Sequence, residues 1–126
     1  MNNKLANLLE QSLGEIWNER DEAKRMHAMS RIYAPDVIFY ETDDALEIEG
    51  FDAINTRIIE LFKIFPAGTA FHFKTGDEIN HGVIKKSWSL GLPGAPPIAT
   101  GMDVAIIENG LIKAFHLFLD SPAIDN

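Results

Sequence analysis

The sequence contains no cysteine among its 126 residues, which excludes disulfide bonds, thiolate nucleophiles and thiolate metal sites together. It also lacks a long apolar run near its N-terminus, because Glu10, Gln11 and Glu15 interrupt that segment. Signal peptides and membrane spans need such a run, so we expect a cytoplasmic protein without a membrane partner. No glycine-rich phosphate loop and no His-x-x-x-His motif occurs, and we therefore expect no cofactor and no metal.

Positive charge is scarce as well. The chain has 11 Lys and Arg residues against 19 Asp and Glu residues, which gives a net charge of −8. The basic residues are scattered, and Lys85-Lys86 is the only adjacent pair in the C-terminal half. A surface of this charge repels phosphate backbones, so the sequence predicts no nucleic-acid partner.

What the sequence does contain is an ordinary globular composition, with 46% hydrophobic and 24% charged residues. A chain of this length is too short for two independent cores but can bury a stable one. We therefore expect a single domain that spans residues 1–126.

Three amphipathic helices are expected in the N-terminal half. The first has apolar residues at three- and four-residue spacing, namely Leu5, Leu8, Leu9, Leu13, Ile16 and Trp17. Asp21 can cap a second helix, which continues until Ala34-Pro35 ends it. Gly50 precedes a third helix, whose apolar face consists of Phe51, Ile54, Ile58, Leu61 and Phe62.

The strands are expected around and after these helices. Residues 37–42 are β-branched and aromatic, and residues 46–48 can form a short return strand after an acidic turn. Four further strands are expected at residues 69–75, 83–90, 99–107 and 111–119. Asn109-Gly110 suits a two-residue hairpin of type I′, and His81-Gly82 is typical of another hairpin turn.

Helices followed by a run of antiparallel strands predict an α+β fold rather than a parallel nucleotide-binding sheet. The last strand, at residues 111–119, carries apolar side chains on both faces. One face would cover the helices, and the other is too apolar for contact with water. We therefore expect a homodimer that forms through the outer sheet face.

Several short motifs follow one another in a characteristic order along nearly the whole chain. They are Trp17-Asn18-Glu19-Arg20-Asp21, Tyr33-Ala34-Pro35-Asp36-Val37, Glu49-Gly50-Phe51-Asp52-Ala53-Ile54, Phe65-Pro66, His81-Gly82, Trp88-Ser89-Leu90, Gly101-Met102-Asp103-Val104 and Asn109-Gly110-Leu111-Ile112. In this order the chain resembles the nuclear transport factor 2-like superfamily, and within it the SnoaL-like polyketide cyclase and ketosteroid isomerase branch.

The resemblance implies a cystatin-like cone, in which three N-terminal helices pack on a curved antiparallel sheet with a mixed edge and enclose a pocket. It implies much less about function. The superfamily includes isomerases, cyclases, dehydratases, epoxide hydrolases, transport adaptors and association domains, and the fold alone does not distinguish them.

Glu41 is the first candidate for a catalytic residue. Alternation along the strand places it on the same face as Phe39. The resemblance implies a general base at this distance after Tyr33, and a carboxylate in an apolar pocket has a raised pKa that suits proton abstraction next to a carbonyl. Alternatively, Glu41 is a solvated residue at the strand end.

Asp103 is the second candidate, because it follows Gly101-Met102 in an otherwise apolar strand. The resemblance implies a protonated acid here that binds an enolate oxygen, which requires a dry site. A purely structural hydrogen bond is the alternative.

The resemblance also has departures. The isomerases place a tyrosine on the first helix as a second donor to the oxyanion, whereas the nearest position here holds Trp17, whose indole N–H donates one hydrogen bond but cannot relay a proton. Trp88 could line the pocket or lie in the core. We expect the substrate-binding wall to contain Trp17, Phe39, Phe62, Trp88, Phe115 and Leu117.

The histidines give no metal motif. If the phenylalanines around them face inward, His72 and His116 point to the outer sheet face, and the opposite phase would aim His116 into the pocket as a possible base.

These residues predict a pocket protein that acts without cofactor on a small, largely apolar carbonyl compound, as an isomerase, cyclase or dehydratase. Glu41 would move a proton at the carbon next to the carbonyl, and Asp103, with Trp17, would stabilise the oxyanion. The alternative is a non-catalytic ligand-binding or dimerisation module of the same fold.

Overall fold

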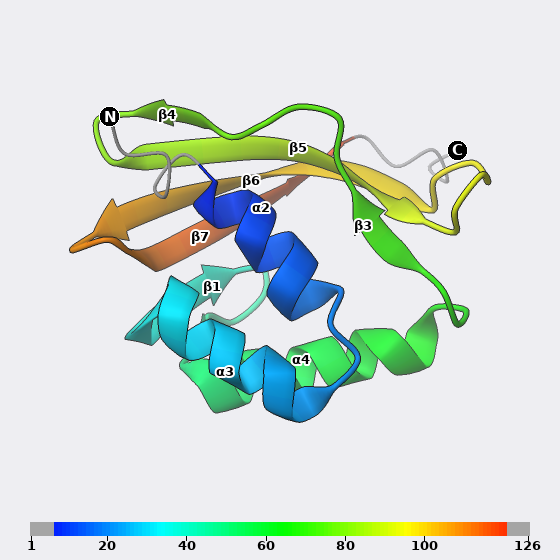
Figure 1. The fold of residues 1–126 in the computed structure, drawn as a ribbon, viewed down its shortest axis with the longest axis horizontal. Coiled ribbons are helices and arrows are strands. Elements are labelled where there is room, and N and C mark those ends of the chain that lie inside the picture. The colour runs from blue at the N-terminus through cyan, green and yellow to red at the C-terminus, as the bar shows by residue number, and fades with distance from the viewer. Residues whose placement is uncertain (1–6, 121–126) are drawn as a thin grey trace.

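The fold, given by a computed structural model, is described for residues 7–120 and consists of helices packed on one face of a curved sheet (Figure 1). In Figure 1 the strands β5, β6 and β7 run across the upper part of the molecule, α2 crosses in front of β7, and α3 and α4 lie at the bottom. This arrangement confirms the expected α+β class with a mixed, curved sheet.

The helices begin with α2 (Leu8–Ser12), which continues without a break into the π-helix η1 (Leu13–Trp17). Helix α3 (Glu22–Ile32) begins where expected, because the carboxylate of Asp21 accepts hydrogen bonds from the backbone N–H groups of Ala23 and Lys24 at 3.0 and 3.3 Å. Helix α4 (Phe51–Ile64) follows Gly50, whose φ of 90° few other residues adopt. Leu5, the first residue of the expected apolar face, lies outside the described residues.

Helix α3 ends one residue earlier than predicted, and Tyr33 already belongs to strand β1 (Tyr33–Tyr40). Tyr33 has an extended backbone and pairs with Ile112 of β7, a contact that no local pattern shows. The strand thus begins four residues before and ends two residues before the predicted range of residues 37–42, and Glu41 lies just beyond it.

The other strands are β2 (Ile48–Glu49), β3 (Ala70–His72), β4 (Glu78–Asn80), β5 (Val83–Gly91), β6 (Ala99–Glu108) and β7 (Leu111–Leu119). Strand β3 is shorter than predicted and β4 was not predicted. The two expected hairpin turns are confirmed, since His81, Gly82, Asn109 and Gly110 all have positive φ between paired strands.

The strand order is β2-β1-β7-β6-β5-β3, with β4 paired to the free part of β5. The pair β1–β7 is parallel and all other pairs are antiparallel. On the inner face, cross-strand partners of β5 and β6 are Ile84 with Ala105, Lys86 with Asp103 and Trp88 with Gly101, and all six are buried. The inner face of these central strands therefore meets the helices and builds the site.

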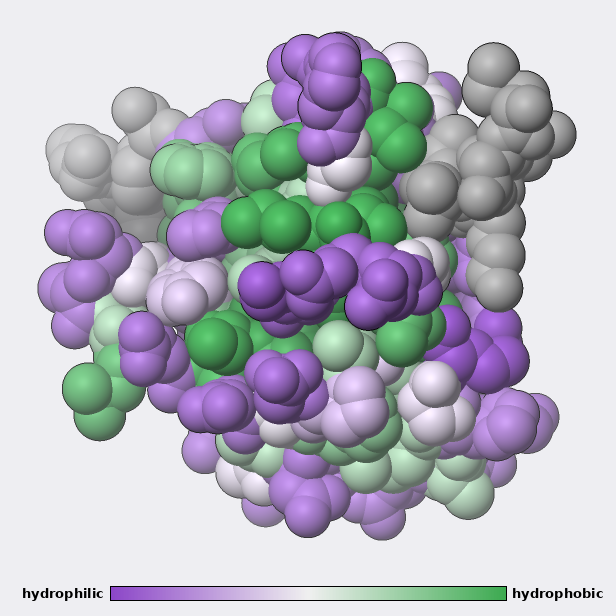
Figure 2. All heavy atoms as spheres, turned by 90° about the vertical axis from the view of Figure 1, so that its left-hand side faces the viewer, coloured by the Kyte–Doolittle hydropathy of each residue, from purple (hydrophilic) through white to green (hydrophobic). Residues whose placement is uncertain are grey.

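The outer surface is partly apolar. Figure 2 shows the side at the left of Figure 1, where hydrophobic side chains gather in bands that a strip of hydrophilic side chains separates. On the outer sheet face, Phe118 of β7 and Ile106 of β6 are 59% and 42% exposed. Among the described helices none is both long and apolar enough to cross a membrane.

Candidate functional site

A cavity of about 210 Å³, called here the large cavity, lies between the helices and the inner face of the sheet. Its lining is mainly aliphatic and aromatic, and three charged side chains, Glu41, Arg57 and Asp103, interrupt it. The complete lining is Leu13, Trp17, Phe39, Glu41, Arg57, Leu61, Phe65, Phe71, Trp88, Leu90, Ala99, Asp103, Phe115, Leu117 and Leu119. An apolar cavity with a few polar groups is the usual form of a small-molecule site.

Trp17 forms the centre of the aromatic wall. Its indole contacts the ring edges of Phe39, Phe71 and Phe115 at centroid distances of 5.2, 6.3 and 6.4 Å. Phe115 in turn stacks on Phe39 at 4.6 Å. Trp17 and Leu13 are the two ends of η1, and both line the large cavity, so the π-helix places two of its residues in the wall.

The expectation that Trp17 donates a hydrogen bond to a ligand was wrong. Its Nε1–H donates instead to the hydroxyl of Tyr33 at 3.0 Å, and this hydroxyl also lies 2.5 Å from the Oγ of Ser12. All three side chains are buried. Burial raises the pKa of Tyr33, which keeps its hydroxyl neutral. The network therefore fixes the Trp17 ring as a wall and uses its only N–H.

Asp103 is the most unusual polar group of the large cavity. It is 6% exposed, and its Oδ1 accepts one hydrogen bond, from Trp88 Nε1–H at 3.0 Å. Burial raises the pKa of this carboxyl to about 7, and the Trp88 hydrogen bond lowers it by a smaller amount. Asp103 can therefore be either a neutral donor or a charged acceptor near physiological pH.

Gly101 makes this arrangement possible. A Cβ atom at Gly101 would lie 2.8 Å from both the Cζ2 of Trp88 and the backbone oxygen of Phe118. Because glycine leaves this space free, the Trp88 ring lies across β6 and reaches Asp103 two residues away. Trp88 is thus buried and also lines the cavity, so both alternatives considered for it apply together.

Glu41 also lines the large cavity, but it differs from the lone, desolvated carboxylate that we expected. Arg57 of α4 donates from Nε to Oε1 and from Nη2 to Oε2, each at 2.8 Å, and also contacts Glu60 at 3.1 Å. Both oxygens of Glu41 are therefore occupied by a bidentate ion pair. This pair raises the pKa of Arg57. Sequence reasoning missed Arg57, because nothing in the helical pattern shows that it turns toward the strand.

The predicted binding residues are mostly brought together. Trp17, Phe39, Trp88, Phe115 and Leu117 all line the large cavity. Phe62 does not, and the expectation for it was wrong. It lies under the guanidinium of Arg20, 4.1 Å from the ring centroid, and faces a second cavity. The pattern placed Phe62 on the apolar face of α4 correctly but could not show that this face spans two cavities.

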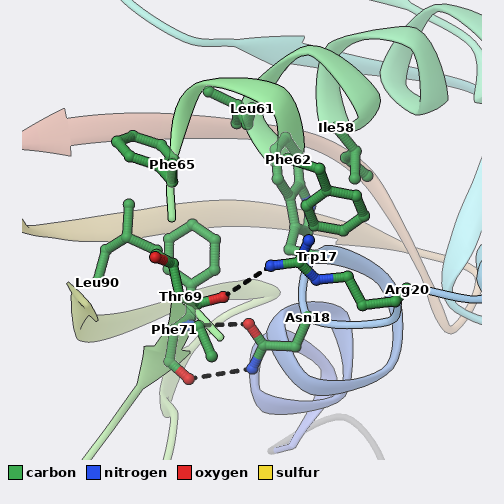
Figure 3. A pocket seen from close by; sticks show the side chains of 11 residues that line it. Trp17, Asn18, Arg20, Ile58, Leu61, Phe62, Phe65, Thr69, Phe71 and Leu90 are labelled. Carbon is green, nitrogen blue, oxygen red and sulfur yellow. Dashed lines mark hydrogen bonds between the residues drawn. The ribbon is translucent and has the colours of Figure 1, made fainter. Parts of the chain in front are cut away.

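This second cavity, called here the small cavity, has a volume of about 20 Å³ (Figure 3). Its lining is Trp17, Asn18, Arg20, Ile58, Leu61, Phe62, Phe65, Thr69, Ala70, Phe71 and Leu90. Figure 3 shows Asn18 bound to the backbone of Phe71 on both sides, through its Oδ1 at 2.7 Å and its Nδ2 at 3.0 Å. Arg20 donates to the backbone oxygen of Thr69 at 3.3 Å.

The histidines lie away from the large cavity. His116 stacks on Tyr40 with a centroid distance of 4.5 Å, on the face of β7 opposite to Phe115 and Leu117. His72 is exposed on β3. Within residues 7–120, no group of three or more His, Asp or Glu side chains is placed to hold a metal ion.

A second charged cluster was not foreseen and lies outside both cavities. Lys86 is buried, with its Nζ 3.4 Å from Asp77 and 4.4 Å from the Phe73 ring centroid, and it also binds the backbone oxygen of Thr75. Asp77 accepts from the backbone N–H of Leu9 at 2.8 Å, and burial raises its pKa. This cluster attaches the start of α2 to the sheet, which is a structural role.

No protein-family model matches the sequence, and no curated protein matches it significantly. Several solved structures, in contrast, have a fold similar to that of this chain. A proposed isomerase of the SnoaL-like family from Agrobacterium tumefaciens has a TM-score of 0.81 with 24% identity, over 95% of this chain and 100% of that one.

Two further solved structures agree over most of the chain. A proposed SnoaL-like polyketide cyclase from Jannaschia sp. has a TM-score of 0.74 with 14% identity, over 94% of this chain and 86% of that one. A proposed ketosteroid isomerase from Kribbella flavida has a TM-score of 0.68 with 13% identity, over 98% of this chain and 83% of that one. The chain thus has the cystatin-like fold of SnoaL-like and nuclear transport factor 2-like proteins.

Proposed function

We propose that this protein is a SnoaL-like pocket protein that binds a small, largely apolar carbonyl compound and moves a proton at the carbon next to the carbonyl, without a cofactor. The observation that carries the proposal is Asp103, a buried carboxyl in the wall of an aromatic cavity with a pKa near 7 and one hydrogen bond. A titratable group of this kind in a cavity is typical of proton-transfer sites.

The neutral form of Asp103 has the main role in this proposal. Its O–H donates a hydrogen bond to the carbonyl oxygen, and the bond strengthens as negative charge develops on that oxygen. The charged form offers no donor. Because deprotonation of Asp103 removes this donor, binding of a carbonyl compound is expected to weaken as pH rises through 7.

Glu41 is the group proposed to accept the proton from carbon and to return it to another carbon or to an oxygen of the substrate. Since both of its oxygens are hydrogen-bonded by Arg57, one of these bonds has to open before Glu41 meets the substrate. Return of the proton to another carbon gives an isomer. When the enolate carbon instead attacks a second carbonyl of the same compound, the proton goes to the resulting alkoxide and a ring is closed. When a hydroxyl on the next carbon leaves, the proton goes to it, and water and an alkene are formed.

The same ion pair favours a second candidate function, a non-catalytic ligand-binding module. In that case Glu41 only joins the end of β1 to α4, and Asp103 only orients the ligand. The exposed apolar side chains of the outer sheet face, such as Phe118 and Ile106, are then the proposed contact of a homodimer.

The experiment uses phenol and cyclohexenone as probes and the emission of the two tryptophans, both of which line the large cavity, as readout. Asp103→Asn and Glu41→Gln are compared with wild type at pH 6 and pH 8.5. Binding of cyclohexenone that weakens with rising pH in wild type but not in Asp103→Asn supports the proposal, whereas phenol, which can donate its O–H to charged Asp103, should keep its affinity. Cyclohexenone binding that is insensitive to both pH and Asp103 refutes it. Turnover of an enolisable ketone that Glu41→Gln abolishes separates the enzyme from the binding module.

A further inference from the structure

The large and small cavities share part of their walls. Trp17, Leu61, Phe65, Phe71 and Leu90 line both. The Trp17 side chain is held by its hydrogen bond to Tyr33. The other four have apolar side chains without polar atoms, so joining the two spaces requires a change of their rotamers and breaks no side-chain hydrogen bond.

Leu61 is one of the four residues of this partition that are only partly buried. It lies on α4 one turn after Arg57 and is only half-buried, whereas Trp17 is 7% exposed. Figure 3 shows Leu61 and Phe62 on α4 and Phe65 just after the end of this helix, and all three line the small cavity. A leucine at this position separates the cavities without a hydrogen bond that would resist its movement.

The small cavity contains one polar side chain that the fold leaves unsatisfied. Thr69 is 8% exposed, its backbone N–H donates to Pro66 at 3.1 Å, and its backbone oxygen accepts from Arg20. Its hydroxyl, in contrast, is buried and has no hydrogen-bond partner among the described residues. Buried hydroxyls are rarely left unpaired, because desolvation without a partner is costly.

The size of the small cavity matches a single polar group. Its 20 Å³ exceed the roughly 10–15 Å³ that one water needs, but leave no room for a ring. The lining around Thr69 is otherwise mostly apolar, and Arg20 is already engaged with Phe62 and with the Thr69 backbone.

We infer that the small cavity is a second compartment of the ligand site, in which the Thr69 hydroxyl pairs with an oxygen at the far end of the ligand after Leu61 has moved aside. The inference rests on the proposed function, because it takes the large cavity as the site of the ligand's main body. It specifies the ligand class further: a compound with an apolar middle and two oxygen functions, one directed to Asp103 and one to Thr69.

The test uses three probes that share one phenol group: phenol, 4-butylphenol and 4-(3-hydroxypropyl)phenol. The last two have the same chain length and differ in one terminal methyl or hydroxyl. Their dissociation constants are measured by calorimetry on wild type and on Thr69→Val, which replaces the hydroxyl by a methyl group of similar size. Thr56→Val, on the exposed side of α4 and outside both cavities, is the matched control.

We expect Thr69→Val to raise the dissociation constant of 4-(3-hydroxypropyl)phenol about threefold to tenfold, which is the usual effect of losing one hydrogen bond. The dissociation constants of phenol and 4-butylphenol should stay unchanged. Leu61→Ala is expected to increase the affinity for 4-butylphenol and 4-(3-hydroxypropyl)phenol relative to the affinity for phenol. Ile64→Ala, which removes a 65% exposed side chain from the same helix, should change none of them.

Equal affinities of Thr69→Val and wild type for the hydroxylated probe would overturn the inference while phenol binding still supports the proposed function. Failure of all three probes to bind wild type would refute both. Unfolding by denaturant in the absence of ligand shows whether Thr69→Val has a folding defect. Because the unpaired hydroxyl contributes nothing, Thr69→Val should unfold at the same or a higher denaturant concentration than wild type. A loss of stability beyond that of Thr56→Val would show a structural partner and overturn the inference.

Discussion

The two carboxylates of the large cavity, Asp103 and Glu41, lie in opposite electrostatic surroundings. Asp103 is buried, has one neutral donor and has a pKa raised to about 7. Glu41 is one-fifth exposed and is held by two charge-assisted hydrogen bonds from Arg57. The same chemical group is thus a titrating acid in one wall and half of a fixed ion pair in the other.

This difference assigns the two residues different roles. A carboxyl that is partly protonated near pH 7 can donate a hydrogen bond to a ligand oxygen without first breaking another contact. A carboxylate with both oxygens occupied has to break a contact first. The difference also has opposite consequences for stability, because burial of Asp103 costs free energy when it is charged, whereas the Glu41–Arg57 pair is stabilising.

The largest expected effect comes from Asp103→Asn. Because the folded-state pKa of about 7 exceeds the ordinary value of 3.8, the folded protein binds the Asp103 proton more tightly than the unfolded chain. Stability from this group is thus complete below pH 3.8 and is lost as pH rises to 7, by about 4 kcal/mol at most. Asp103→Asn should abolish this loss. Urea unfolding at pH 5 and pH 8.5 measures the part of this loss that falls above pH 5, about 2.7 kcal/mol. A variant with the same pH dependence as wild type would contradict the difference between Asp103 and Glu41.

Gly101→Ala should disturb the Asp103 wall sterically. The new Cβ would meet the Trp88 ring and the Phe118 backbone oxygen at 2.8 Å, so we expect a loss of about 2–3 kcal/mol and displacement of the Trp88 ring. Gly14→Ala is the matched control, because nothing lies within 4 Å of its added Cβ. Thermal denaturation of both variants checks the prediction, and equal melting temperatures would contradict it.

Trp88→Phe keeps an aromatic ring but removes the N–H that Asp103 accepts. Since this hydrogen bond favours the charged form, its loss should raise the pKa of Asp103 further. The measurement is the pH midpoint of the change in stability. A midpoint that moves downward would show that Trp88 favours the neutral acid instead.

Glu41→Gln is expected to have the smallest effect, a loss of about 1 kcal/mol, because its ion pair with Arg57 is partly exposed. The loss should shrink in high salt and leave the pH dependence near 7 unchanged. Arg57→Gln serves as the reciprocal variant. The measurement is chemical denaturation at two salt concentrations and at pH 5 and pH 8.5. A loss of stability that changes with pH but not with salt would contradict the prediction.

Local features of the fold were predictable from the sequence. The turn at Asn109-Gly110 and the cap at Asp21 depend on residues that are neighbours in the chain, and both are confirmed. Asp103 could be identified as an acid in an apolar strand. Its dry surroundings depend on a helix wall supplied from the other end of the chain.

What sequence reasoning missed depends on contacts between distant residues. Tyr33 takes the only N–H of Trp17 from 16 positions away, and Arg57 reaches Glu41 across the same separation. Neither pairing leaves a periodic signal, because each partner already fits the apolar or polar pattern of its own element. The same holds for Thr69, whose unpaired hydroxyl is recognisable only once its surroundings are known.

The most direct test of this account is the titration of the Asp103 carboxyl carbon by NMR, with carbon-13-labelled aspartate and Asp103→Asn to assign the resonance. The account predicts a midpoint near pH 7, far above that of the exposed aspartates. A midpoint near pH 4 would contradict it, because Asp103 would then be charged at neutral pH and could not donate a proton to a carbonyl oxygen.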